Sequence, residues 1–296
     1  MTLVTVKEVF MQFNSFKIQD KHSDWSRHIK WRYIPWMVIA VVVFGFPFYW
    51  IIVGSLASNT AISTGSVPLI PFHPHWLNYL KAWTYTNFGR QLLNTLIMAT
   101  AVTLAQVLTS SMAGFALARM HFPGRELVFI GFIATLIVPF QVIALPIFIL
   151  MANLHWVNTF AALIVPTAVN AFGIFLYRQF FLTIPQSFEE AAMLDGANPW
   201  QVLWQVYWPL ARPATVTLSL LTFIAEWNSF YLPFLFTQGK SMYTVQLGLV
   251  AFQGEFATIY NLLMAATVFV SIPIFILYLI GQRAIVEGIA TTGTKG

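Results

Sequence analysis

The sequence predicts an all-α integral membrane protein with six transmembrane helices. Its 296 residues are 58% hydrophobic and only 8% charged, whereas soluble domains carry roughly a quarter of charged residues. Apolar segments long enough to cross a bilayer recur along the chain. Lys and Arg are concentrated in alternate connecting segments, as they are on the cytoplasmic side of membrane proteins. Together these patterns exclude an ordinary soluble fold.

Each expected span is a stretch of about 20 apolar residues, because unpaired backbone groups in hydrocarbon cost several kcal/mol each. The apolar stretch 127–177 is too long for one crossing, and Asn153, His155 and Asn158 divide it. Two spans are therefore expected there, with a re-entrant hairpin as the alternative. The expected spans are 34–56, 92–117, 127–151, 157–177, 214–236 and 256–281. The chain thus divides into an N-terminal segment 1–33, a transmembrane domain 34–283 and a C-terminal tail 284–296.

The basic residues predict that both ends of the chain are cytoplasmic. With the N-terminus inside, only Lys81, Arg90 and Lys240 lie in outer loops, and all other Lys and Arg residues lie in inner segments. Short basic loops stay cytoplasmic, so this bias fits an even number of spans. We therefore expect a multi-pass protein of the cell (inner) membrane. The inner basic residues are Lys7, Lys17, Lys21, Arg27, Lys30, Arg32, Arg119, Arg125, Arg178, Arg212, Arg283 and Lys295.

Several kinds of chemistry are excluded by the composition and spacing. The chain has no cysteine, which removes disulfides and thiol catalysis. His73 and His75 lie two residues apart in an outer loop, unlike the helical pairs that bind metal. The net charge of +5 is spread between apolar spans, which argues against nucleic acid and for membrane lipid as the surroundings. We expect no catalytic residue, no metal and no cofactor on this chain.

The chain also lacks its own phosphate-binding loop. Such a loop requires Gly, four residues, then Gly-Lys-Ser/Thr opening a helix. The triplet Gly239-Lys240-Ser241 has Phe234 at the position of the first Gly and lies in a predicted outer loop. Any nucleotide-driven activity must therefore depend on another polypeptide.

The long cytoplasmic loop 179–213 is predicted to fold as helix, turn and helix. Ser187 can cap a first helix, with Glu190 completing a capping box. Gly196 can adopt the left-handed conformation that ends a helix. This first helix is short, so it needs tertiary packing to be stable.

The second helix of the loop has its own start and stop signals. Asn198 is a predicted N-cap, Pro199 suits the first helical position, and Gln201 stands where a capping partner belongs. Pro209 and Pro213 discourage continuation into the fifth span. The loop can therefore serve either as a surface structure packed on its own bundle or as an element that docks in a partner's groove.

The stretch EEAAMLDGANPWQVLWQVYWPL resembles the EAA loop of ABC importer permeases, whose pattern is Glu-Ala-Ala, three residues, Gly, nine residues, Ile, one residue, Leu-Pro. Val206 replaces the Ile, and Trp208 stands where Leu is usual. The resemblance implies that this segment, with Glu189 and Asp195, couples the permease to a separate ATPase. The matching residues are Glu190, Ala191, Ala192, Gly196 and Pro209.

The resemblance extends to the carbohydrate-importer branch, and most closely to the shorter permease subunit of maltose-type importers. The similar segments are ARMHFPGR at 118–125, EWNSF at 226–230 and the tail 287–296. It implies the transmembrane domain of a type I ABC importer. It also implies a heterodimer with a second permease, two copies of an ATPase that binds ATP and Mg, and an extracytoplasmic solute-binding protein.

The resemblance also assigns a role to one outer loop, which in the maltose-type subunit probes the binding protein. A solvated turn is the alternative interpretation of this loop. By position, the contact residues are Gln238, Gly239, Lys240, Ser241, Met242 and Tyr243.

One charged residue falls within an expected span. Glu226 is costly in hydrocarbon, so it is expected to face a bundle interior or a wet cavity. With Trp227, Asn228 and Tyr231 it forms a candidate translocation path. The alternative is a structural hydrogen bond from Glu226 and Asn228 to a neighbouring helix.

Two other functional classes compete with the importer. A secondary transporter or channel usually carries several intramembrane ionisable groups, and a membrane enzyme needs converging acids, bases or metal ligands. The sequence shows neither pattern, and the secondary transporter or channel is kept as the alternative. The resemblance implies a sugar importer that works by alternating access, with an oligosaccharide as its substrate. Neutral oligosaccharides, acidic uronate chains and polyol phosphates all remain open.

Overall fold

The computed structural model describes residues 33–254 and 258–293, with side chains described as far as Gln282. The regular secondary structure of these residues is helical, and their only strand-like pairing is an isolated bridge between Gln253 and Thr258. The expected all-α class is therefore confirmed for the described chain. The N-terminal segment up to residue 32 and the start of the predicted last span lie outside the described residues.

The chain divides into two compact units, residues 1–50 and 51–296. Helix α2 (Ile34–Ser55) belongs to both, and it is apolar on all sides with Pro47 in its interior. In its first-unit part, Phe46 and Trp50 stack with ring centroids 6.1 Å apart. Most of its apolar side chains are exposed, as expected for a helix that faces lipid or another protein.

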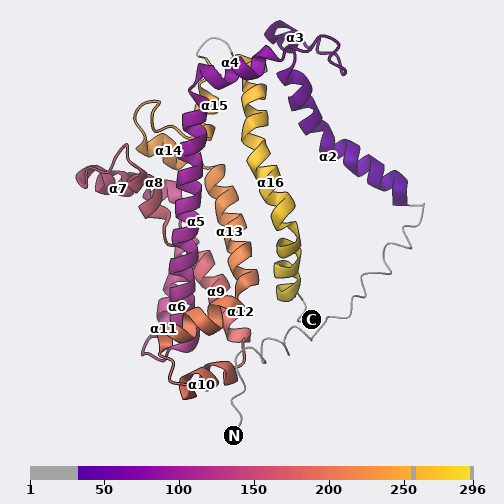
Figure 1. Ribbon diagram of the computed structural model, residues 1–296. Coiled ribbons are helices and arrows are strands. Elements are labelled where there is room, and N and C mark those ends of the chain that lie inside the picture. Colours follow the sequence, from indigo (N-terminus) through magenta and orange to yellow (C-terminus); the bar gives the residue numbers. More distant parts are fainter. Residues whose placement is uncertain (1–32, 255–257, 294–296) are drawn as a thin grey trace. The chain divides into compact units, whose positions relative to one another are not determined.

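The second unit is built from helices and short helical turns (Figure 1). In chain order they are α3 (Asn59–Ser63), α4 (Leu77–Tyr85), α5 (Phe88–Arg119), α6 (Arg125–Thr135), α7 (Phe140–Asn153), α8 (Phe160–Ile164), the 3-10 turn η3 (Val165–Thr167), α9 (Ala171–Thr183), α10 (Ser187–Leu194), α11 (Pro199–Gln201), the π-helical η4 (Val202–Tyr207), α12 (Trp208–Leu210), α13 (Arg212–Trp227), α14 (Tyr231–Phe236), α15 (Val245–Val250) and α16 (Tyr260–Gly293).

Helix α5 is the central element of this unit. It packs along α9 and α13, and α13 packs in turn on α16 (Figure 1). The close approach of α5 to α9 depends on Gly114, because a Cβ atom there would lie 2.7 Å from the Cβ of Tyr177. Small residues at such crossings allow helix backbones to meet in membranes.

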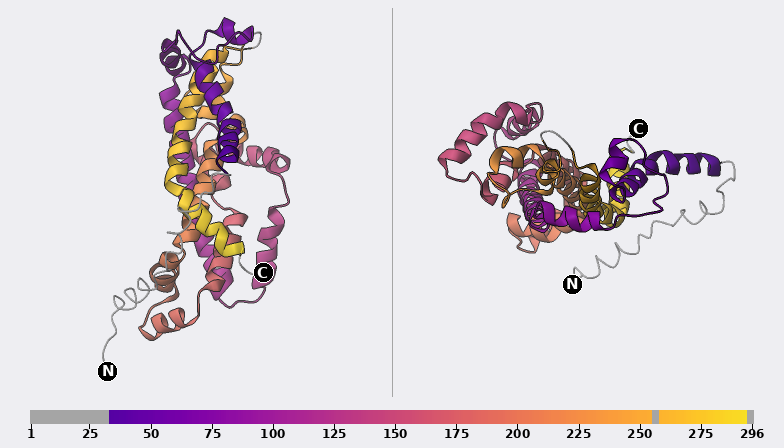
Figure 2. Two further views of the ribbon diagram at one scale, coloured as in Figure 1. Left: turned by 90° about the vertical axis from the view of Figure 1, so that its right-hand side faces the viewer. Right: turned by 90° about the horizontal axis from the view of Figure 1, so that it is seen from above.

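The described helices supply three single candidate spans, or up to five if each bent pair counts as one. The predicted span 127–151 is not one straight helix, because α6 and α7 meet at 99° (Figure 2). Pro139 caps α7, and a proline both lacks an N–H and restricts the residue before it. The fourth predicted span is similarly bent, by 43°, between η3 and α9.

The predicted fifth span 214–236 is divided as well. Its first helix, α13, has 16 residues, which is short of the roughly 20 needed for a straight crossing. The chain leaves helical geometry after Trp227 and resumes as α14, with Pro233 in the first turn. A proline is tolerated there but not in the interior of a continuous helix.

Candidate functional site

Helix α10 forms the first half of the loop 179–213, which is predicted to be cytoplasmic, and it begins one residue earlier than predicted. Gln186 is its N-cap residue and makes no side-chain cap hydrogen bond. The predicted capping box of Ser187 and Glu190 is therefore wrong. Gln186 already has helical backbone angles, so Ser187 lies inside the first turn, where its hydroxyl is not placed to cap. Glu189 and Glu190 still occupy the first turn, where the helix dipole favours negative charge.

The turn after α10 agrees with the prediction for Gly196, whose φ is +86°. The Gly196 N–H donates to the Met193 carbonyl at 3.0 Å, and the Ala197 N–H donates to the Ala192 carbonyl at 2.9 Å. These two bonds make a Schellman motif, which requires a left-handed residue at this position. The end of α10 is thus set by Gly196.

The second half of the loop begins with the predicted capping box. The Gln201 N–H donates to Asn198 Oδ1, and the Asn198 N–H donates to Gln201 Oε1, both at 2.9 Å. Helical structure then continues past Pro209 to Leu210, further than predicted. The turns of η4 before Pro209 are π-helical, and this wider winding relieves the clash of a proline ring with the carbonyl four residues earlier.

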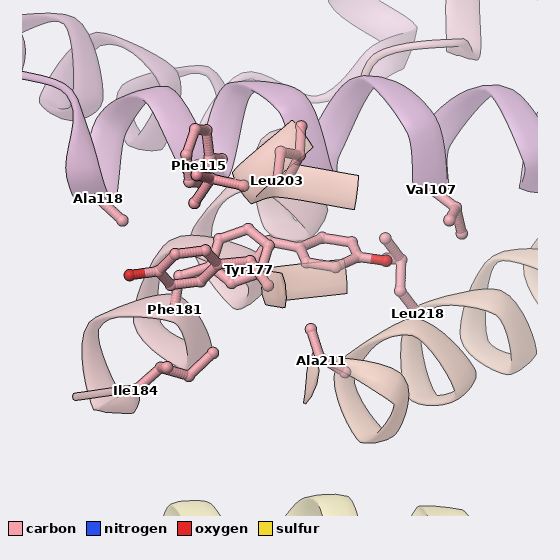
Figure 3. Close-up of a cluster of buried hydrophobic side chains, with 12 residues drawn as sticks. Val107, Phe115, Ala118, Tyr177, Phe181, Ile184, Leu203, Ala211 and Leu218 are labelled. Carbon is pink, nitrogen blue, oxygen red and sulfur yellow. The ribbon is translucent and has the colours of Figure 1, made fainter. Parts of the chain in front are cut away.

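A buried cluster of side chains joins this loop to the C-terminal halves of α5 and α9 and to the N-terminal half of α13. Figure 3 shows the aromatic rings of Phe115, Tyr177 and Phe181 packed together at its centre. Its buried members are Val107, Phe115, Ala118, Tyr177, Phe181, Ile184, Val202, Leu203, Tyr207, Ala211, Ala214 and Leu218. From α10, Phe188 and Ala192 pack against the cluster.

Arg119, the last residue of α5, lies at the edge of this cluster. Its Nη2 donates to the carbonyl of Phe181 at 2.6 Å and also to the carbonyl of Ile184. Its guanidinium carbon lies 5.0 Å from the centre of the Tyr207 ring. The Tyr207 hydroxyl donates to Glu189 Oε2 at 3.0 Å. Burial, followed by the hydrogen bond to Glu189, raises the pKa of Tyr207, while the Arg119 charge opposes the shift.

A groove of about 360 Å³ lies between α10 and the end of α5. It is lined by Phe115, Arg119, Met120, His121, Gln186, Glu189, Glu190, Met193 and Pro199. The groove therefore brings the predicted coupling residues Glu189 and Glu190 to one surface. The remaining predicted coupling residues lie in α10 (Ala191, Ala192), in the turn (Asp195, Gly196) and in α12 (Pro209).

A second arginine fixes the start of α6. Arg178 Nη2 lies 2.7 and 2.9 Å from the two carboxylate oxygens of Glu126, and its Nε donates to the Leu117 carbonyl at 3.2 Å. The guanidinium carbon also lies 4.0 Å from the centre of the Phe129 ring. A single guanidinium nitrogen thus pairs with both carboxylate oxygens, while the other contacts of Arg178 hold the guanidinium against α5 and α6. In the sequence, Arg119 and Arg178 indicated only the orientation of the chain in the membrane. Their buried positions depend on contacts with residues far away in the sequence, which a local pattern does not reveal.

The predicted contact loop 238–243 is held at both ends. Asn158 Oδ1 accepts from the Gln238 N–H at 2.8 Å, and Asn94 Nδ2 donates to the carbonyls of Ser241 and Tyr243 at 2.8 and 3.0 Å. Gly239 has a φ of +91°. The residues from Gln238 to Ser241 are exposed, whereas Met242 packs inward. The loop is a braced turn with an exposed tip.

The candidate path residues are not equivalent in the structure. Glu226 Oε2 is buried and has no hydrogen-bond partner among the described residues. Asn228 is exposed and pairs with Gln246 at 3.1 Å, and Tyr231 is exposed beside Phe140. Trp227 instead is buried and donates from Nε1 to the Val270 carbonyl at 3.1 Å, within the unit's own core.

The chain is similar in sequence to a family of membrane transport proteins and to permease proteins of bacteria. Residues 106–291 match the family described as the binding-protein-dependent transport system inner membrane component. The arabinooligosaccharides transport system permease protein AraQ of Halalkalibacterium halodurans is 30% identical over 259 residues, which cover 85% of this chain and 91% of that protein. The diacetylchitobiose uptake system permease protein NgcG of Streptomyces coelicolor is 31% identical over 265 residues, which cover 88% of this chain and 86% of that protein.

Among solved structures, this chain resembles one from a bacterial ABC transporter involved in the import of the acidic polysaccharide alginate. The TM-score is 0.75 at 24% sequence identity, and the match covers 96% of this chain and 99% of that chain. At this identity the likeness concerns the fold.

Proposed function

Because this chain belongs to the family of binding-protein-dependent transport system inner membrane components, we propose that it is a permease subunit of an ATP-driven ABC importer for oligosaccharides. The observation that carries the proposal is the similarity over most of the chain to permease proteins named for oligosaccharide uptake. The chain itself is not an enzyme in this proposal, and ATP and Mg bind to a separate ATPase.

The proposed complex contains a second permease, two copies of the ATPase and an extracytoplasmic binding protein. In it the chain crosses the membrane six times, with the bent pairs and α13–α14 as crossings and both termini cytoplasmic. The braced tip at Gln238 to Tyr243 contacts the binding protein. Its exposed position and its anchoring by Asn94 and Asn158 support that role.

The proposed docking element is α10 with its Gly196 turn. An eight-residue helix with small residues at Ala191 and Ala192 can lie deep in a partner's cleft, and the groove beside it exposes Glu189 and Glu190. Closure of the ATPase dimer on ATP would move α10 and, through it, the spans. Alternating access follows when the two permeases rock together, and hydrolysis resets the cycle.

The proposed translocation path follows the break between α13 and α14. Glu226, Asn228 and Tyr231 offer a carboxylate, an amide and an aromatic ring, which are groups that suit sugar hydroxyls and ring faces. Trp227 supports these residues from within the core. The candidate path residues include the carboxylate of Glu226 and no basic side chain, so a neutral oligosaccharide is favoured over an acidic one.

The deciding experiment is affinity purification of the tagged protein from gently solubilised native membranes, followed by mass identification of stoichiometric partners. We expect a second permease and an ATPase present in two copies. A matched purification after crosslinking from a cysteine placed at Met193, which lies in the groove and is 47% exposed, should capture the ATPase. Recovery of a monodisperse chain without an ATPase in both preparations would refute the proposal.

The substrate class is tested with the binding protein encoded beside the purified partners. Calorimetric titration with neutral oligosaccharides, alginate oligosaccharides and a polyol phosphate distinguishes the alternatives. We expect binding of a neutral oligosaccharide, and tighter binding of an acidic chain would contradict that choice.

A further inference from the structure

A continuous chain of side chains connects α10 to the ends of α5 and α9, and most of it lies outside the EAA pattern. We propose that Tyr207 is the positioning residue that transmits the movement of α10 to α5 and α9. Its hydroxyl is bonded to Glu189 of α10, and its ring contacts the guanidinium of Arg119 at the end of α5. The inference rests on the proposed function, since it assigns a route to the coupling that this function requires.

The first argument is that α10 has few other attachments. None of its eight residues is buried, and apolar packing against the neighbouring cluster comes from Phe188 and Ala192. Among the described residues, the bond from the Tyr207 hydroxyl to Glu189 is the side-chain hydrogen bond that joins α10 to another element. A helix hinged at Gly196 can therefore tilt, and this bond determines which elements its tilt displaces.

The second argument is the position of Tyr207 at the meeting point of several elements. Its side chain is fully buried in η4, and its ring makes edge contacts with Phe115 of α5 and Phe181 of α9, at centroid distances of 5.3 and 5.4 Å. A displacement of the ring therefore displaces the side chains of α5 and α9 that contact it, because buried side chains at native density cannot move independently.

The third argument is the role of Arg119. Arg119 donates to two carbonyls at the end of α9: that of Phe181, which also accepts from the Ile184 N–H, and that of Ile184. The guanidinium lies against the Tyr207 ring, where a cation is attracted to the aromatic face. Arg119 therefore fastens α5 to α9 at the place where Tyr207 reaches them.

The chemistry of the hydroxyl fits a permanent link. Burial and the bond to Glu189 raise the pKa of Tyr207 further above its ordinary value, so the hydroxyl keeps its proton and donates to Glu189 Oε2. Charge-assisted hydrogen bonds of this kind are stronger than neutral ones. A carboxylate on an exposed helix and a buried donor make a link that survives rocking of α10.

The test uses the full complex in proteoliposomes and measures sugar transported per ATP hydrolysed. Tyr207→Phe keeps the ring and removes only the hydroxyl, Glu189→Ala removes the acceptor, and the double variant removes both. Tyr278→Phe, at an exposed position of α16, is the matched control. Assembly with the ATPase and the midpoint of thermal unfolding are measured for each complex, because a purely structural residue would change these instead.

We expect Tyr207→Phe and Glu189→Ala each to lower the transport-to-hydrolysis ratio about tenfold, which corresponds to the loss of one hydrogen bond to a charged group. The double variant should fall no further, since residues acting through one contact are not additive. Glu189→Gln, which keeps an acceptor without the charge, should be intermediate.

Two results would overturn the inference. One is a Tyr207→Phe complex with the wild-type ratio, and the other is a loss confined to assembly or unfolding temperature. Multiplying effects in the double variant would equally contradict a shared route. Failure of the wild-type chain to assemble with any ATPase would instead refute the proposed function itself, so the two failures are distinguishable.

Discussion

The turn at Gly196 allows a graded test of the proposed docking element, because the effect of backbone strain at this position can be separated from that of steric crowding. Its φ is +86°, and a Cβ atom built there meets nothing within 4 Å. A substituted side chain therefore encounters backbone strain without a steric clash inside the chain. For an L-residue, left-handed backbone costs about 1–2 kcal/mol, and β-branched residues are the least tolerant. Asn tolerates this conformation better than other side chains.

These values predict an order of activity. Gly196→Asn should remain close to wild type, Gly196→Ala should be impaired, and Gly196→Val should be the most impaired in ATP-dependent transport. A strain of about 1.4 kcal/mol corresponds to a tenfold change in the equilibrium between the turn that ends α10 and an opened form of that turn. The effect matters because α10 is only eight residues long, and so short a helix is marginal without its packing.

The assay is substrate uptake into proteoliposomes together with the amount of ATPase that copurifies. Gly131→Ala is the matched control, because Gly131 lies in α6 with open space around it and without a positive φ. Full transport and assembly in Gly196→Val would refute the reasoning. A Gly196→Asn protein worse than Gly196→Val would also refute it, because the tolerance of Asn for left-handed backbone would then give no advantage.

Three further perturbations address the fold and the loops. Gly114→Val should lower the midpoint of thermal unfolding in detergent, because overpacking typically costs about 1–3 kcal/mol and α9 lies in direct contact; an unchanged midpoint would contradict the close crossing. Arg178→Met should also lower the midpoint, since it removes the ion pair with Glu126 and the bond to the Leu117 carbonyl, and a double-mutant cycle with Glu126→Gln should show coupling between the two sites. Asn94→Ala should speed hydrogen exchange across 238–243 without reducing copurified ATPase, and equal exchange rates would show that the loop is braced otherwise.

The features that the sequence predicted correctly are those whose cause lies within a few residues. Gly196 closes a helix because of its own backbone freedom, and the Asn198 capping box needs only a partner three residues away. The cap predicted at Ser187 failed although it obeyed the same rule. The helical backbone angles of Gln186 moved the start of α10, and nothing in the local pattern separated the two registers.

The breaks within the apolar segments show where such reasoning ends. Pro139 lies at the bend between α6 and α7, whereas Pro146 lies inside α7 and Pro273 lies inside α16 without ending either helix. A proline permits a break, but packing of neighbouring helices decides whether one occurs. The same holds for the buried arginines. Arg119 reaches carbonyls 62 and 65 residues away, and no periodicity reports a contact of that separation.

The hydrogen bonds along α5 indicate which parts of the unit move together. Gln106 Nε2 donates to the Thr167 carbonyl at 2.7 Å, just before the bend that leads into α9, and its Oε1 accepts from the Thr222 hydroxyl of α13 at 2.9 Å. One side chain of α5 thus bonds both to η3, which leads into α9, and to α13, while Arg119 bonds to the far end of α9.

A force applied at the end of α5 therefore reaches α13 without passing through a loop. Gly173 of α9 lies so close to Ser110 of α5 that the two helices cannot slide past each other without separating. The flexible points are instead the helical breaks, between η3 and α9 and after Trp227. Glu226 lies at the second break, one turn beyond Thr222. When α5, α9 and α13 move together as a rigid group, the change in geometry therefore occurs at the breaks, beside the residues that we place along the translocation path.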